Sequence, residues 1–226
     1  MREILSKLPG VFIQGLYCVD ADGTVIFEKK LPKEATIASE AIAARFNATI
    51  IGNYEDAIYC NTAGDPQLLD EVNSLWGEPV PIPVDSLAND GPQFHKLVFM
   101  SNDVDMLRDD MRPELELLAK ENGATVTTSF PTVLEILPEG CSKALGVRKL
   151  CEKLGVDPGK ELLALGDAEN DKEMLETACI GVAMGNASPV AKAAADIELV
   201  ETSSQGGAGL AMERYSKLGS EEDDSS

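Results

Sequence analysis

The pattern of apolar and polar residues predicts a parallel α/β unit near the carboxyl end of the chain. The apolar runs 162–165 and 180–184 are typical of buried parallel strands, and the segment between them has helical spacing. Asp167 and Asp171 follow the first of these strands. They are therefore expected at the carboxyl edge of a parallel sheet, where open α/β folds bind their ligands.

Before residue 138 the pattern is mixed, with hairpins and helices in turn. Asp20-Ala21-Asp22-Gly23 lies between two β-rich runs, which predicts a hairpin turn. Further strands are expected at 48–51, 57–60, 96–100, 124–128 and 133–137. Helices are expected at 32–46, 66–76 and 103–122, the last of them broken or kinked before Pro113, and residues 79–83 are expected to be an extended connection. This mixture predicts an α+β unit over residues 8–137.

The remaining chain predicts two further segments. Residues 138–218 carry the parallel strands, with helices at 142–154, 189–194 and 208–218 and a strand at 197–200. Residues 219–226 are too charged to pack and are expected to be disordered.

Composition excludes several classes of function. The formal charge of −20 argues against a nucleic-acid backbone or an anionic membrane surface as partner. No apolar run approaches the ~20 residues of a membrane span, so a soluble protein is expected. The five cysteines show no paired spacing, which favours a reducing compartment such as the cytoplasm or the plastid stroma. His95, the single histidine, begins an expected strand and is assigned a structural role.

Asp167, Asn170 and Asp171 place two carboxylates and a carboxamide on one loop. Oxygen donors of this kind suit Mg²⁺. Aspartate and asparagine are also common helix caps, and Asn170 stands where such a cap would be expected. Spacing alone leaves the metal site and the helix cap as alternatives.

The sequence GDAENDKEML, residues 166–175, resembles the fourth motif, GDxxND, of the haloacid dehalogenase (HAD) superfamily of phosphatases. The similarity to the Cof-type branch, whose members carry a large cap domain, continues through residues 180–200. The resemblance implies an α/β, HAD-like (Rossmannoid) core with an α+β cap. It also implies Mg²⁺-dependent hydrolysis of a small phosphorylated metabolite, with a substrate that the sequence does not identify.

Roles for single residues follow from the same resemblance. Gly140-Cys141-Ser142-Lys143 resembles the third motif, which makes Lys143 catalytic and, with Asn170, a phosphate ligand. Asp167 and Asp171 are the implied metal ligands. Asn186 and Lys192 are expected to brace the loop and the helix beside them.

The nucleophile motif of this superfamily, DxDGT, has one match, at Asp20-Ala21-Asp22-Gly23-Thr24. Taken literally, Asp20 is the nucleophile, Asp22 the acid/base, and Thr62 the second-motif hydroxyl. Residues 9–32, however, resemble the first hairpin of a Cof-type cap, particularly that of plant and algal relatives. Too little chain precedes Lys143 for half a core and a whole cap, so the hairpin interpretation is preferred.

On that interpretation the chain holds a cap and the C-terminal half of a HAD core, without the catalytic aspartate pair. One edge of the core sheet is then expected to be exposed. A truncated gene model, a fragment completed by a partner chain and a degenerate binding protein are the alternatives. The functional hypotheses are a Mg²⁺-dependent phosphatase by descent, a non-catalytic binding or regulatory protein of the same fold, and an active phosphatase with Asp20 as nucleophile.

Overall fold

The computed structural model describes residues 8–215, without the side chain of Ser129. The expected tail 219–226 and the end of the expected helix 208–218 lie outside these residues. The chain forms two compact units, Met1–Phe27 with Ser142–Ser226 and Glu28–Cys141. Residues 8–27, expected in the cap, thus belong to the unit that carries the parallel strands.

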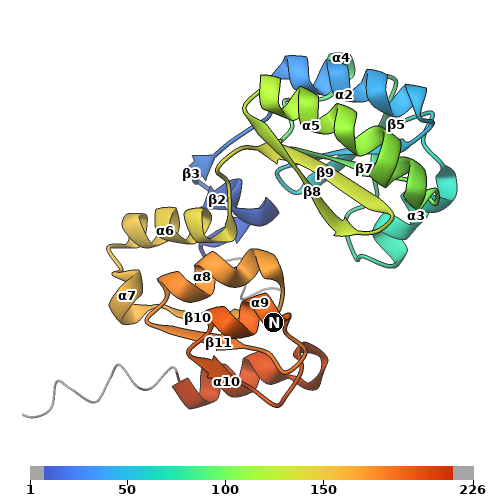
Figure 1. Cartoon of the computed structure of the whole chain (residues 1–226). Coiled ribbons are helices and arrows are strands. Elements are labelled where there is room, and N and C mark those ends of the chain that lie inside the picture. Colours follow the sequence, from blue (N-terminus) through green and yellow to red (C-terminus); the bar gives the residue numbers. More distant parts are fainter. Residues whose placement is uncertain (1–7, 216–226) are drawn as a thin grey trace, which may run out of the picture. The chain divides into compact units, whose positions relative to one another are not determined.

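A small parallel sheet organises the first unit (Figure 1). Its strands are β10 (Leu163–Gly166), β11 (Ile180–Ala183) and β12 (Ile197–Glu198), in the order β10-β11-β12. Helices α8 (Lys172–Thr177) and α9 (Pro189–Ala194) cover one face, and α10 (Gly207–Tyr215) packs on the other. The predicted α/β fold class is confirmed. Among the described residues no strand pairs with the outer edge of β10.

The hairpin predicted around Asp20 is also confirmed. Strands β1 (Gly10–Phe12), β2 (Tyr17–Val19) and β3 (Val25–Glu28) form a three-stranded sheet, and residues 21–23 form an exposed turn. The β-rich run before Asp20 is not one strand, because a 3₁₀ turn, η1 (Ile13–Gly15), interrupts it with positive φ at all three residues.

That turn explains why residues 8–27 join the first unit. Gly15 packs against the first turn of helix α6 (Lys143–Leu154), so closely that a Cβ atom there would lie 2.2 Å from the carbonyl oxygen of Ser142. The thiol of Cys18 lies 3.7 Å from the carbonyl oxygen of Gly146 in the same helix. These two contacts link the hairpin to α6. The unit is completed by α7 (Pro158–Glu161), η3 (Glu169–Asp171) and η4 (Ser203–Gln205).

The second unit is built on a six-stranded sheet with the order β6-β5-β4-β7-β9-β8. Its strands are β4 (Thr49–Tyr54), β5 (Ala57–Asn61), β6 (Ile82–Val84), β7 (Lys96–Met100), β8 (Ala124–Phe130) and β9 (Val133–Pro138). Its helices are α2 (Lys33–Arg45), α3 (Pro66–Ser74), α4 (Leu87–Asp90) and α5 (Arg112–Glu121), the last preceded by a π-helical segment, η2 (Met106–Met111).

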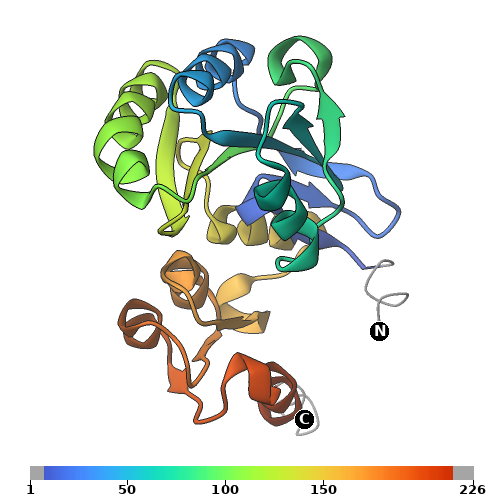
Figure 2. The same ribbon diagram turned by 90° about the vertical axis from the view of Figure 1, so that its right-hand side faces the viewer.

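Alternating side chains give this sheet two apolar faces. Ile50, Leu97 and Ile136 pack with side chains of α2 and α5, whereas Ile51, Val98 and Val133 pack with side chains of α3. The ribbon views show α2 and α5 on one side of the sheet and α3 on the other (Figures 1 and 2). The mixed, largely antiparallel sheet agrees with the α+β character predicted for this part of the chain. The end of the expected connection 79–83 instead belongs to the edge strand β6, and Pro83 is tolerated there because edge strands leave one side unpaired. No described helix is long and apolar enough to cross a membrane.

Candidate active site

Lys143 and Asp171 form the centre of the candidate site. Lys143 is the first residue of α6, and its Nζ lies 2.6 Å from Oδ1 of Asp171. The Asp171 side chain is buried, 4% exposed, whereas that of Lys143 is 35% exposed. A cation at a helix N-terminus is unfavourable by itself. The buried carboxylate offsets this and holds the ammonium group at the carboxyl edge of the sheet.

The second oxygen of Asp171 fixes the loop that follows β10. Its Oδ2 accepts hydrogen bonds from the backbone N–H groups of Asp167 at 3.0 Å and Ala168 at 2.9 Å. Gly166 makes this fold possible, because a Cβ atom there would lie 2.6 Å from the Cβ of Asp171. Asp171 therefore caps the loop and holds Lys143 at the same time, and Asn170 does not have the capping role expected of it.

Asp167 presents a carboxylate at the edge of the same loop. Its Oδ2 accepts hydrogen bonds from Ser203 Oγ at 2.7 Å and from Asn186 Nδ2 at 3.0 Å. These two bonds, with the nearby Lys143 charge, lower the pKa of Asp167 below its usual range, although partial burial opposes the shift. Asp167 is therefore fully ionised at neutral pH.

Ser203 is a site residue that the sequence did not reveal. It begins η4, and its backbone N–H donates to Asn186 Oδ1 at 2.8 Å. Asn186 thus bridges Asp167 and the η4 turn, in agreement with its expected bracing role. The only signal in the sequence is a run of small hydroxyl residues before Gly206, which is typical of many surface turns.

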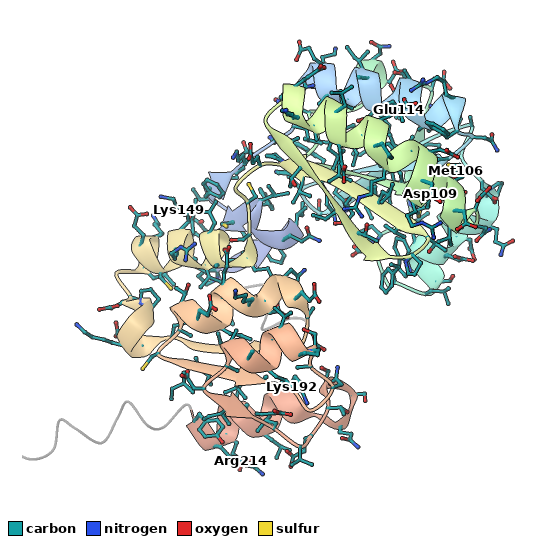
Figure 3. All side chains as sticks on the ribbon, viewed as in Figure 1. Met106, Asp109, Glu114, Lys149, Lys192 and Arg214 are labelled. Carbon is teal, nitrogen blue, oxygen red and sulfur yellow. The ribbon has the colours of Figure 1, made fainter. Side chains whose placement is uncertain are left out.

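Two other residues that were expected in or beside the site lie at its edge. Asn170 is exposed in η3, between Glu169 and Asp171, and its carboxamide makes no hydrogen bond with a described residue. Lys192 pairs with Glu198 of β12, which ties α9 to the sheet (Figure 3). Lys192 therefore braces its helix, as expected, without contacting Asp167.

The structure separates the apparent nucleophile motif from this site. Asp20 lies 3.7 Å from Nζ of Lys153, near the far end of α6. At ~1.5 Å of rise per residue, Lys153 lies about 15 Å along the helix from Lys143. Asp22 accepts a hydrogen bond from the backbone N–H of Thr24 in the hairpin turn. Thr62 follows β5 and belongs to the second unit. Asp20 is therefore not placed to act with Lys143 and Asp167.

The donor atoms fit a divalent cation at Asp167 but not at Asp171. In residues 8–215, Oδ1 of Asp167 accepts no hydrogen bond and is open to a ligand. Both oxygens of Asp171 are already bonded, to Lys143 and to two backbone N–H groups. No group of three or more His, Cys, Asp or Glu side chains suited to a metal is present among the described residues. Asp171 therefore supports the loop and Lys143, and it has no free oxygen atom for a cation.

Comparison with known proteins places this geometry in a family. The model of a family described as haloacid dehalogenase-like hydrolase matches residues 1–212. The chain is 32% identical over 215 residues to "Endoribonuclease YBEY, chloroplastic" of Arabidopsis thaliana, which covers 94% of this chain and 36% of that protein. It is 38% identical over 112 residues to 5-amino-6-(5-phospho-D-ribitylamino)uracil phosphatase YcsE of Bacillus subtilis (strain 168), covering 49% of this chain and 44% of that protein.

A solved structure agrees with the same assignment. A haloacid dehalogenase-like hydrolase from Bacteroides thetaiotaomicron superposes with a TM-score of 0.78 and 28% identity, covering 89% of this chain and 74% of that chain. The chain spans 36% and 44% of the lengths of the two curated relatives above. The endoribonuclease name describes a protein of which only about a third is matched, so it carries no activity over to this chain.

Proposed function

This chain belongs to the haloacid dehalogenase-like hydrolases, and from that premise we propose that it contributes the cation and phosphate site of a phosphatase acting on small phosphate monoesters. The observation that carries the proposal is the open, ionised carboxylate of Asp167 near the ammonium group of Lys143. A carboxylate that takes a cation and a lysine that takes phosphoryl oxygens are complementary parts of a phosphate site. The name of the Bacillus subtilis relative, a phosphatase, supports the reaction class.

Each residue has a distinct task in this proposal. Lys143 neutralises charge on the phosphoryl oxygens, and Asp171 sets the position of its ammonium group through the 2.6 Å contact. Asn170, exposed on the same loop, donates its amide hydrogens to a phosphoryl oxygen. Asn186 and Ser203 hold the Asp167 carboxylate in one orientation.

Asp167 is the proposed Mg²⁺ ligand, with Asp171 behind it as the residue that shapes the loop. When bound, the cation would supply Lewis-acid stabilisation of the phosphoryl oxygens. The low pKa of Asp167 supports this role, because a ligand carboxylate must be deprotonated.

A second candidate function is a non-catalytic binding or regulatory module of the same fold. It is favoured by the position of Asp20 near Lys153 and by the absence, among the described residues, of a third carboxylate beside Asp167. A partner chain paired with the outer edge of β10 would belong to this candidate. For location, the chloroplast in the name of the Arabidopsis relative supports the plastid stroma over the cytoplasm.

Hydrolysis of p-nitrophenyl phosphate with and without MgCl₂ tests the proposal. Wild type would be compared with Asp167→Asn, Lys143→Ala and Asp20→Asn. Loss of a charge-stabilising group typically lowers kcat by about 10²–10³. We expect losses of this size for Asp167→Asn and Lys143→Ala and an unchanged rate for Asp20→Asn.

Binding measurements separate the two candidate functions. Calorimetric titration with MgCl₂ and with inorganic phosphate should show saturable binding that Asp167→Asn and Lys143→Ala weaken, respectively. Binding without turnover supports the non-catalytic module. Folded protein that neither binds nor hydrolyses would contradict both candidates, and a rate abolished by Asp20→Asn would restore Asp20 as nucleophile.

A further inference from the structure

A cleft of about 400 Å³ opens on the second unit, on the sheet face that carries α3. Its apolar floor comes from neighbouring strands and includes Ile51, Ile58 and Val98. These side chains are at most 4% exposed, so the floor is fixed by sheet packing. The volume lies in the range of small-molecule sites, roughly 300–1,000 Å³. The cleft lies wholly within one unit and shares no residue with the Lys143 site.

An aromatic wall stands at the rim of this cleft. Trp76, which follows α3, and Phe130, the last residue of β8, stack with ring centroids 6.3 Å apart and an interplanar angle of 26°. Trp76 is 39% exposed and Phe130 56% exposed, although residues of this size are usually buried. The two stacked rings are partly exposed beside the apolar floor, so another planar ring can stack on them.

Two charged side chains that pair with each other also line the cleft. Lys96 Nζ lies 3.1 Å from Glu135 Oε1, and both side chains line the cleft. The Lys96 side chain is 13% exposed and that of Glu135 is 6% exposed. A buried ion pair is costly to desolvate and adds little stability compared with apolar residues of similar size. Its presence in an apolar floor therefore points to recognition of a polar group.

Asn53 adds a neutral polar group beside this pair. It lies directly opposite Lys96 in the β4–β7 register and also lines the cleft. Its Oδ1 is buried and makes no hydrogen bond with any described residue. An unsatisfied buried acceptor costs stability, and that cost would be removed if the carboxamide turned to accept a hydrogen bond from a ligand in the cleft.

We propose that this cleft binds a planar, nitrogen-containing heterocycle, which stacks on Trp76 and Phe130 and directs its polar edge toward Asn53, Lys96 and Glu135. A carboxamide, an ammonium and a carboxylate together match a ring edge that carries both hydrogen-bond donors and acceptors. A hydrocarbon ring would leave the Asn53 oxygen without a hydrogen bond, and a puckered sugar ring would stack less completely. The inference does not depend on the proposed catalytic role, because no residue of that site takes part.

Trp76 is the single tryptophan of the chain, so its fluorescence reports on this cleft. The full chain would be titrated with uracil, adenine and glucose. We expect saturable quenching by uracil or adenine, with Kd below roughly 1 mM, and none by glucose. No saturable quenching by either base, or an equal response to glucose, would overturn the proposal.

Two variants and a matched control make the test specific. Phe130→Ala should weaken base binding about fivefold, the size of one lost ring–ring contact. Phe12→Ala, at a phenylalanine of the first unit with similar exposure, should leave binding unchanged. Asn53→Leu should weaken binding while Tm stays constant or rises, because an unsatisfied buried acceptor is removed. Equal weakening by Phe12→Ala and Phe130→Ala would contradict the assigned site, as would unaltered binding in Asn53→Leu.

Discussion

Lys143 and Asp171 meet at 2.6 Å between the first residue of α6 and the loop after β10. The two residues are far apart in the sequence, but the pair connects the helix that packs on the N-terminal hairpin with the strand that presents Asp167. One carboxylate oxygen serves Lys143 and the other serves two backbone N–H groups. Removal of this carboxylate would therefore loosen the loop and the lysine together.

Asp171→Asn should lower the free energy of unfolding by about 1–3 kcal/mol. The substitution replaces a buried charged acceptor by a neutral amide and leaves Lys143 without its partner. Urea unfolding followed by circular dichroism measures the loss. Glu152→Gln is the control, because the Lys149–Glu152 pair lies exposed on the same helix (Figure 3). Its effect should stay within about 0.5 kcal/mol, and an equal loss in both variants would contradict the role assigned to Asp171.

Ser203→Ala should raise the pKa of Asp167, because the Ser203 hydroxyl is the largest cause of its low value. A carboxyl whose pKa is lower in the folded state adds stability above its unfolded pKa of ~3.9 and loses it as pH falls through the folded value. The variant should therefore be less stable by about 1 kcal/mol at pH 7, with a deficit that shrinks in strong acid.

Urea unfolding at neutral and acid pH, with NMR titration of the Asp167 carboxyl carbon, measures both effects. Ser204→Ala is the matched control, since the Ser204 hydroxyl lies 3.0 Å from that of Thr202 and bonds to no carboxylate in residues 8–215. A loss of stability in Ser203→Ala that does not depend on pH, or an equal loss in both variants, would contradict the assignment of Ser203 to the site.

Two helical glycines should respond with opposite signs to the same substitution. A Cβ atom at Gly146 of α6 would lie 2.7 Å from Cα of Gly15 and 2.5 Å from a Val11 methyl, whereas one at Gly209 of α10 would meet no atom of the described residues within 4 Å. Gly146→Ala should destabilise by about 1–3 kcal/mol through overpacking. Gly209→Ala should stabilise by about 0.5–1 kcal/mol through helix propensity. Chemical unfolding followed by circular dichroism decides the signs, and stabilisation by Gly146→Ala would refute the close approach of hairpin and helix.

The sequence predicted those elements whose signal is local. Apolar runs located β10 and β11, a proline marked the start of α3 and of α9, and Asp-Gly located the hairpin turn. The family motifs assigned Lys143 and Asp171 to one site, but the direct contact between the two side chains was not predicted, because no local pattern contains it.

Other features depend on tertiary contacts that have no pattern in the chain. Ser203 reaches Asp167 only because β12 and η4 return to the edge of the sheet. The hairpin joins the first unit because Gly15 and Gly146 let two backbones approach, and glycine alone does not specify its neighbour. The Trp76–Phe130 wall likewise joins the end of a helix to the end of a strand, each of which looks like an ordinary terminus in the sequence.

His95 should make the second unit less stable as pH falls below about 6.5. Its side chain is fully buried, and burial, assisted by the Lys30 charge, lowers its pKa despite the Glu28 carboxylate 3.5 Å away. The unfolded chain then binds the proton more readily, so acid favours unfolding below the unfolded pKa of ~6.5. Wild type should lose on the order of 1 kcal/mol between pH 7.5 and 5.5 relative to His95→Gln. Urea unfolding followed by Trp76 fluorescence reports on the unfolding of this unit. If the free energy of unfolding depends on pH in the same way in both proteins, His95 is not the titrating group.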